Sequence, residues 1–260
     1  MVDFLERIGM KALNRISSSA ESFAFSAELI TKMINPKSYN PAVVSVLIKQ
    51  IYFTSVQLLP FFILLSILIG SAVIGLLVSL AINYGLIDSI GSIIVNLVMD
   101  EFAPFITVLL LALRSGAAMN TEIAVMKVSR ELKTLEYFKI DPFTYLYIPR
   151  VLNGMISMLL LAGLFAVIAI ASGYFFLALS LNMGIRLYVD TIIEAISLVD
   201  IFTLILKSIL FGYALSAIPI YRGTQAMMRY NTIPIAVLQG MVKLFVAIII
   251  IEVLSFVRLM

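Results

Sequence analysis

Apolar residues run along this chain in long stretches that short polar segments separate. No charged residue occurs between Lys49 and Asp88, and none between Arg150 and Arg186. A helix needs about 20 apolar residues to cross roughly 30 Å of hydrocarbon. We therefore predict an all-α membrane protein, one domain over residues 1–260, with five spans at about 58–82, 90–113, 151–177, 201–221 and 235–257.

The N-terminal segment has a different periodicity, one that is typical of an amphipathic helix. Between residues 3 and 34, apolar side chains recur three or four positions apart with charges between them, and Asn35-Pro36 ends the pattern. This pattern predicts a helix that lies on the inner leaflet. The alternative is a water-exposed helix that packs on a loop of the same chain.

The stretch from Arg114 to Arg150 is the most charged part of the sequence and must lie in water or at the interface. Within it, apolar residues recur at helical spacing while acids and bases occupy the remaining faces. We predict an amphipathic helix over residues 117–139, parallel to the membrane, on which another protein docks. A solvated loop helix without a partner is the alternative. The repeating apolar positions are Val125, Val128, Leu132 and Leu135.

Composition excludes most catalytic functions. The chain is 62% hydrophobic and 13% charged, and it contains no cysteine, histidine or tryptophan. Thiol nucleophiles, imidazole bases and most transition-metal sites are thereby absent. There is no G-x-x-x-x-G-K-[ST] segment for nucleotide phosphates. We predict no enzyme activity and no cofactor, and the dispersed net charge of +3 argues against nucleic acid.

The basic residues predict the orientation. Residues 1–57, 114–150 and 222–243 hold fifteen of the eighteen lysines and arginines, whereas residues 83–88 and 182–200 hold one arginine against four acids. Because cytoplasmic loops retain positive charge, we expect a cytoplasmic N-terminus and, after five spans, an external C-terminus.

Two adjacent acids interrupt the second span. Asp100 and Glu101 lie where an ionised carboxylate costs at least about 2.5 kcal/mol, so we expect them to face a polar cavity or a partner. Alternatively, the span starts near Phe102 and both acids lie at its outer boundary. Pro104 is expected to free a backbone carbonyl beside them. Lys207 and Glu252 lie close enough to a membrane face to reach it, which favours a structural role.

Residues 100–150 resemble the MlaE/YrbE permease family, the membrane subunits of ABC transporters that work with MCE proteins. Several ordered motifs carry the resemblance. They are E-x-x-P at 101–104, R-[SA]-G at 114–116, T-E-I at 121–123, E-L-x-[ST]-L-E at 131–136, D-P at 141–142 and P-R at 149–150.

The resemblance implies a homodimeric permease of the bacterial inner membrane that moves phospholipid to or from an extracytoplasmic MCE partner, maintains outer-membrane lipid asymmetry and is driven by a separate ATPase that binds ATP. The lipid site would comprise an apolar lining and two acids for the head group. It would be formed by Met99, Asp100, Glu101, Phe102 and Phe105. The helix after span two would couple to the ATPase, through Arg114, Glu122, Arg130, Glu131, Glu136 and Asp141.

Two departures from the family pattern affect this transfer. Asp100 stands where the family usually has arginine, so the head-group electrostatics differ, and the segment 222–229 replaces the small polar segment that usually opens the last span. Two other function classes remain open from the residues. One is a secondary transporter whose coupling ion binds Asp100 and Glu101. The other is a membrane subunit that anchors partners without transport.

Overall fold

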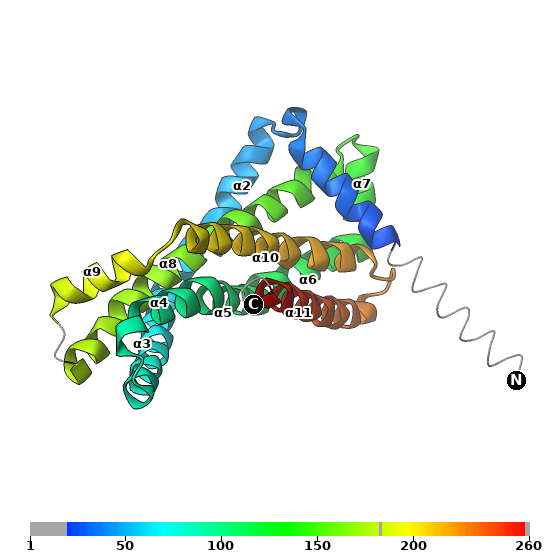
Figure 1. The fold of residues 1–260 in the computed structure, drawn as a ribbon. Coiled ribbons are helices and arrows are strands. Elements are labelled where there is room, and N and C mark those ends of the chain that lie inside the picture. The colour runs from blue at the N-terminus through cyan, green and yellow to red at the C-terminus, as the bar shows by residue number, and fades with distance from the viewer. Residues whose placement is uncertain (1–19, 182–183, 258–260) are drawn as a thin grey trace, which may run out of the picture.

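The computed structural model describes residues 20–181 and 184–257, and every regular element within them is a helix (Figure 1). This confirms the predicted all-α class. Within the same residues, five helical segments are long and apolar enough to cross a membrane, one at each predicted span. They are Pro41–Tyr84, Ile87–Val128, Phe143–Phe175, Leu198–Thr224 and Tyr230–Phe256.

The first segment is longer than the predicted span because a second helix precedes it. After the short turn η1 (Pro36–Ser38), helix α2 (Pro41–Thr54) leads through η2 (Val56–Leu58) into α3 (Leu59–Tyr84). Prolines stand in the first turns of both α2 and α3. The N–H groups of a first turn have no partner within the helix, so proline costs no hydrogen bond there. Gly85 ends α3 with φ 68°, a left-handed conformation that glycine adopts without a steric penalty.

The second segment is one continuous helical path with two wider π-helical stretches in it. After η3 (Ile87–Ser89) come α4 (Ile90–Val95), the π-helix η4 (Asn96–Phe102), α5 (Ala103–Leu111), the π-helix η5 (Ala112–Gly116) and α6 (Ala117–Val128). Both acids lie in η4. The helical path begins well before Phe102, so the alternative span start near Phe102 is not supported.

The single amphipathic helix predicted over residues 117–139 is wrong in its extent. Residues 117–128 continue span two as α6, which packs on spans four and five, the helices α10 (Leu198–Thr224) and α11 (Ile233–Val257). Arg130 then adopts φ 67° and Lys139 φ 58°, and between them lies only the seven-residue helix α7 (Glu131–Tyr137). Left-handed backbone ends a helix at each of these positions. Residues 129–142 therefore form a short loop with one small helix in it, which we call the tip.

Helix α8 (Ile148–Leu181), which follows the π-helix η6 (Phe143–Tyr147), packs along its length on α3 and α10. Small residues make the close approach possible. A Cβ added at Gly70 would overlap the backbone of Ala169, and one added at Gly173 would overlap Ile74. Gly70, Ala169 and Gly173 therefore serve packing within the chain.

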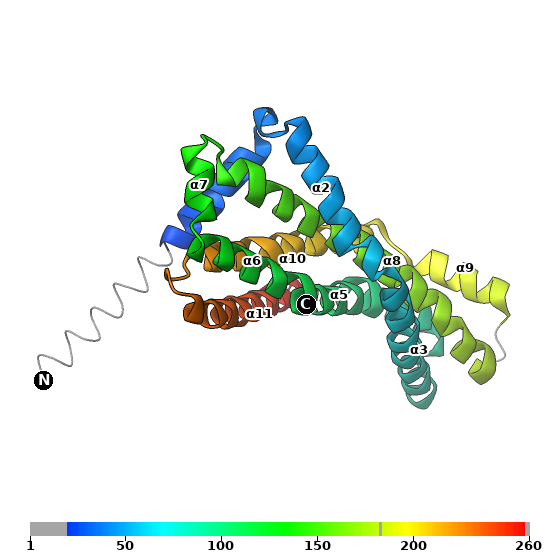
Figure 2. The same cartoon turned by 180° about the vertical axis from the view of Figure 1, so that it is seen from behind.

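The remaining spans form an antiparallel pair. Helix α9 (Ile185–Ala195), which the sequence analysis did not predict, precedes α10 (Leu198–Thr224). A capping box between Ser197 and Asp200 starts α10. After η7 (Tyr230–Thr232), helix α11 (Ile233–Val257) returns beside α10, as both views show (Figures 1 and 2).

Residues 20–34 form a helix at the end of the molecule that also carries α7, far from α9 (Figure 2). Leu29 is fully buried, and the ring of Phe25 contacts Phe143, Tyr147 and Tyr221. The face with Phe23, Ile30 and Ile34 is exposed. One face thus packs on the chain and another is free for a membrane surface. The predicted residues 3–19 lie outside the described residues, and the interfacial location stays a prediction.

Candidate functional site

Three spans bring charged side chains together inside the helical core. The Nζ atom of Lys207, on α10, lies 2.7 Å from Oε2 of Glu101 on η4 and 3.1 Å from Oε2 of Glu252 on α11. The Lys207 side chain is only 2% exposed. The expectation that Lys207 reaches a membrane face is therefore wrong: it points inward and contacts carboxylates from two other spans.

Pro104 explains how a third contact becomes available. Proline has no N–H to donate to the carbonyl four residues earlier, which is that of Asp100. Lys207 donates a hydrogen bond to this carbonyl at 2.8 Å. The ammonium group thus gains an oxygen ligand in addition to the two carboxylates, at the carbonyl that Pro104 was expected to release. Such contacts are required because removing an ammonium from water is unfavourable unless its protons are satisfied.

The five residues predicted for the lipid site lie on one helical turn and a half, but with different exposure. Met99, Asp100 and Glu101 are buried, and Phe102 and Phe105 are half-buried. None of these five residues lines the four cavities described below, whereas Lys207 does. It lines a cavity of about 210 Å³ between α10 and α11, with Leu206, Leu210, Ile251 and Leu254. Lys207 thus links the acids of span two to a cavity between spans four and five.

The residues predicted for ATPase coupling fall into two separate groups. Arg114 and Glu122 line a polar cavity of about 290 Å³ between span two, α2 and α8. Arg114 donates to Oε1 of Gln57, and Glu122 pairs at 2.8 Å with the buried Arg150. This places both residues in contact with the transmembrane bundle.

The second group lies at the tip. Glu136 and Asp141 line another cavity, of about 520 Å³, together with Lys127, Lys133 and Lys139. Arg130 supplies the left-handed turn before α7, and Glu131 accepts a hydrogen bond from Ser129 at 2.8 Å. Glu131 and Arg130 are exposed and belong to the tip itself.

Asp141 ties the tip to the N-terminal helix, because Lys32 Nζ lies 2.7 Å from its carboxylate. Partial burial acts to raise the pKa of Asp141. Hydrogen bonds from Lys32, Thr144 and the Phe143 N–H, with the Lys32 charge, outweigh it and hold the pKa below its ordinary value of 3.8.

Sequence reasoning missed several residues that the structure brings into these sites. Lys207 and Glu252 were assigned to the membrane faces, and the partner roles of Lys32 and Arg150 were not foreseen. A basic residue in one apolar span and an acid in another is the signal for such a pair. Tyr137 and Phe138, 85% and 73% exposed at the end of α7, were also missed.

Among the described residues, no group of acids is arranged to hold a metal ion.

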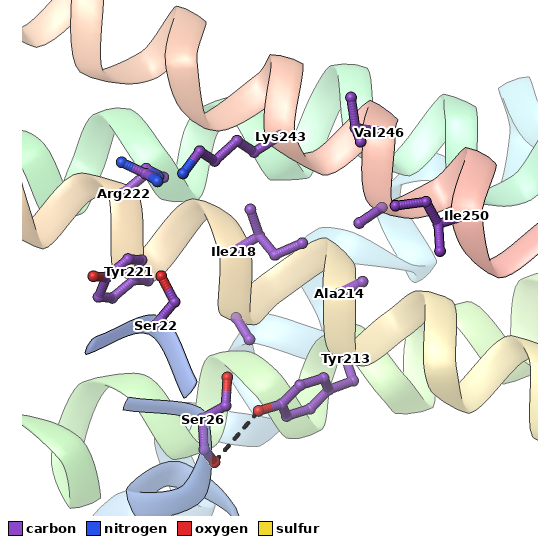
Figure 3. Close-up of a pocket in the computed structure, with 12 residues that line it drawn as sticks. Ser22, Ser26, Tyr213, Ala214, Ile218, Tyr221, Arg222, Lys243, Val246 and Ile250 are labelled. Carbon is purple, nitrogen blue, oxygen red and sulfur yellow. Dashed lines mark hydrogen bonds between the residues drawn. The ribbon is translucent and has the colours of Figure 1, made fainter. Parts of the chain in front are cut away.

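A larger groove lies between α10 and α11, as does the cavity at Lys207, but nearer the tip. Figure 3 shows the residues that line it. Its volume is about 540 Å³, and α10, α11 and the N-terminal helix line it. Its walls are almost entirely apolar, and the side chains of Arg222 and Lys243 supply two positive charges at one end. Tyr213 donates a hydrogen bond to the carbonyl of Ser26 across its edge.

Comparison with known proteins gives a consistent result. The family described as permease MlaE matches residues 47–257. A probable ABC transporter permease protein of Rickettsia typhi is 28% identical over 85% of this chain and 80% of its own length. The intermembrane phospholipid transport system permease protein MlaE of Haemophilus influenzae is 36% identical over 49% of each chain. A chloroplastic protein of Arabidopsis thaliana, trigalactosyldiacylglycerol 1, is 30% identical over 52% of this chain and 38% of its own length.

Proposed function

The chain belongs to the MlaE permease family, and on this basis we propose that it moves phospholipid between the inner membrane and an extracytoplasmic MCE protein, driven by a separate ABC ATPase. It is a multi-pass inner-membrane permease subunit and not an enzyme. In a bacterium with two membranes, this activity would maintain the lipid asymmetry of the outer membrane.

The observation that carries the proposal is the position of Lys207. Its ammonium group is held by Glu101 and Glu252 within the bundle and also lines a cavity between α10 and α11. Charged residues at membrane depth are costly and usually serve a transport path. We assign the polar part of the lipid to this cluster with Asp100, and the acyl chains to the apolar residues Met99, Phe102 and Phe105.

The tip supports the assignment of an ATPase partner. Glu131 and Glu136 lie on the short helix α7, which ends in the exposed rings of Tyr137 and Phe138. Exposed aromatic residues beside charged ones are typical of protein interfaces. Through α6, the tip is continuous with span two and hence with Glu101, so movement at the tip is transmitted along one helical path. Arg114, Glu122, Arg130 and Asp141 belong to the same coupling proposal.

We further propose that the permease is a homodimer with its N-terminus in the cytoplasm and its C-terminus outside. Helix α11 carries a long exposed apolar face, which includes Leu238, Val242, Ile249 and Val253. A second copy or lipid would cover this face. The concentration of lysine and arginine on the side of the tip supports the orientation.

The test is purification of the full chain with its membrane partners, followed by mass spectrometry of bound lipid and transport in liposomes. We expect an ATPase and an MCE protein to co-purify, phospholipid to be retained, and lipid transfer to require ATP. Lipid transfer that a pH gradient alone drives, with no ATPase bound, would instead establish a secondary transporter that uses the buried acids. An assembly with no lipid transfer under either condition would establish an anchoring subunit.

A further inference from the structure

The cavity at Lys207 and the groove at Arg222 follow one face of the same helix pair. On α10 the lining residues recur at helical spacing through Thr203, Lys207, Leu210, Ala214, Ile218 and Arg222. On α11 they recur through Lys243, Ala247, Ile250 and Leu254. Residues three or four apart lie on the same side of a helix. The two hollows are therefore successive parts of one seam.

The charges at the end of the seam are of one sign. The lining residues of the groove include no carboxylate, and no described residue forms an ion pair with Arg222 or Lys243. The Nε atom of Arg222 is buried, and no described residue accepts a hydrogen bond from it. The Lys243 side chain extends along the groove toward the Arg222 guanidinium (Figure 3). Two neighbouring cations without an acid create a site for an anion.

The dimensions suit a lipid rather than a free anion. Beyond the two cations, the lining is mainly apolar, through Ala214, Ile218, Val246 and Ile250. Four hydroxyl groups also line it, those of Ser22, Ser26, Tyr213 and Tyr221. Arg222 is two residues from the end of α10, on the side that carries the tip. At 1.5 Å per residue, the path along α10 from Arg222 to Lys207 is about 22 Å, and one leaflet of the hydrocarbon core is about 15 Å deep. A lipid head group held at Arg222 would therefore place its chains along the seam toward Lys207.

We propose that this groove is an entry site for an anionic phospholipid of the inner leaflet, whose phosphate binds Arg222 and Lys243 and whose acyl chain lies between α10 and α11. The choice of a lipid as ligand rests on the proposed transport function. Beyond that function, the groove would give the permease a preference for anionic head groups. It would also give lipid a lateral route from the inner leaflet to the buried Lys207 and Glu101.

The test uses the full-length protein in nanodiscs that contain phosphatidylglycerol and phosphatidylcholine. Native mass spectrometry measures retained lipid, and a phosphatidylglycerol with a photoreactive acyl chain maps the contact. We expect the double variant Arg222→Gln/Lys243→Gln to lose phosphatidylglycerol by about tenfold or more, since it removes both cations that would hold the phosphate. Retention of phosphatidylcholine, whose choline ammonium offsets the charge of its phosphate, should fall much less. In the unmodified protein, the photoreactive lipid should label the part of α11 around Ala247.

Two further variants separate charge from shape. Arg229→Gln removes one positive charge from the exposed loop after α10, outside the groove, and should leave lipid retention unchanged. Ala247→Phe fills the groove and keeps both cations, and it should displace lipids of either head group. An equal loss in Arg229→Gln, no loss in the double variant, or a disulfide between two copies at Ala247→Cys would overturn the proposal.

The outcomes also distinguish this inference from the proposed function. If ATP-driven lipid transfer persists while the groove variants bind phosphatidylglycerol normally, the groove inference fails and the transport function stands. If the unmodified protein with its ATPase transfers no phospholipid, the proposed function fails, whatever binds in the groove.

Discussion

The ammonium group of Lys207 and the carboxylate of Glu101 meet at 2.7 Å in the middle of the helical bundle. The two residues belong to different spans, and a second carboxylate, that of Glu252, approaches the same ammonium from a third span at 3.1 Å. One lysine thus joins spans two, four and five. This arrangement gives the bundle a polar centre that apolar packing alone would not require.

Removal of this lysine should destabilise the protein strongly. Lys207→Met leaves the buried Glu101 and the half-buried Glu252 without their cation, and loss of one partner of a buried pair typically costs about 3–5 kcal/mol. We expect a clearly lower midpoint of thermal unfolding in detergent, measured by circular dichroism. Lys49→Met, which changes an exposed lysine, is the matched control. An equal shift in both variants would show that Lys207 has no special role.

The close contact between α8 and α10 should not tolerate a methyl group. A Cβ at Gly212 would lie 2.5 Å from Cα of Met155 and 2.6 Å from the carbonyl oxygen of Gly154, both backbone atoms. Gly212→Ala must therefore separate the two helices, at a cost of at least about 1–3 kcal/mol. Its thermal midpoint should fall well below that of the unmodified protein.

Gly163→Ala, on the partner helix α8, provides the control. A Cβ there meets nothing within 4 Å, and alanine is favoured over glycine in a helix interior by up to about 1 kcal/mol. We expect an unchanged or slightly raised midpoint. The contact interpretation would be contradicted if both substitutions lowered the midpoint alike.

The link between Asp141 and Lys32 should hold the N-terminal helix to the tip. Because both side chains are partly exposed, Asp141→Asn should cost less than about 1 kcal/mol of global stability. It should nevertheless speed amide hydrogen exchange within residues 20–34. Asp190→Asn, which changes an exposed acid on α9, should not alter exchange there.

The same link has a defined dependence on pH. The folded pKa of Asp141 lies below 3.8, its ordinary value, so the folded state binds the proton more weakly than the unfolded state does. Its stabilising contribution is complete above the ordinary value and is lost as the pH falls through the lower folded value. Exchange within residues 20–34 should therefore be steady from neutral pH to about pH 5, after correction for intrinsic rates. A faster corrected exchange already near pH 6 would contradict this assignment.

The exposed rings at the end of α7 should be required for binding of the ATPase. Tyr137→Ser/Phe138→Ser removes two large apolar side chains from the tip, and we expect co-purification of the ATPase to be lost while lipid retention by the permease persists. Tyr84→Ser, at the end of α3 in span one and 76% exposed, should leave the ATPase bound. Glu136→Lys should weaken the same association by reversing a charge. Unchanged binding in both tip variants would exclude the tip as the docking site.

Hydrophobic periodicity predicted the architecture well because each span is a local property of the chain. The ends of span four moved by only three residues, from the predicted 201–221 to Leu198–Thr224. The continuous helix predicted over 117–139 was wrong because two non-glycine residues, Arg130 and Lys139, adopt left-handed backbone. Their residue types give no warning of this conformation.

The candidate site was predicted only in part. The buried acids in span two were found because a charge within an apolar run is visible in the sequence. Their partner was not, since Lys207 is 106 positions from Glu101 along the chain, and hydropathy alone does not say which face of a span a lysine occupies. The release of the Asp100 carbonyl by Pro104 was predictable from proline chemistry, whereas the identity of the donor was not.

The separation of Glu101 and Lys207 along the chain also has a consequence during biosynthesis. The ribosome adds about 5–20 residues per second, so the 106 positions between the two residues correspond to roughly 5–20 s. Span two and its carboxylates are made before their cation exists, and Glu252 is made last. Span two must therefore wait in the insertion machinery, at the lipid interface or with its acids protonated until span four arrives, and the charge cluster is complete only once Glu252 has been made.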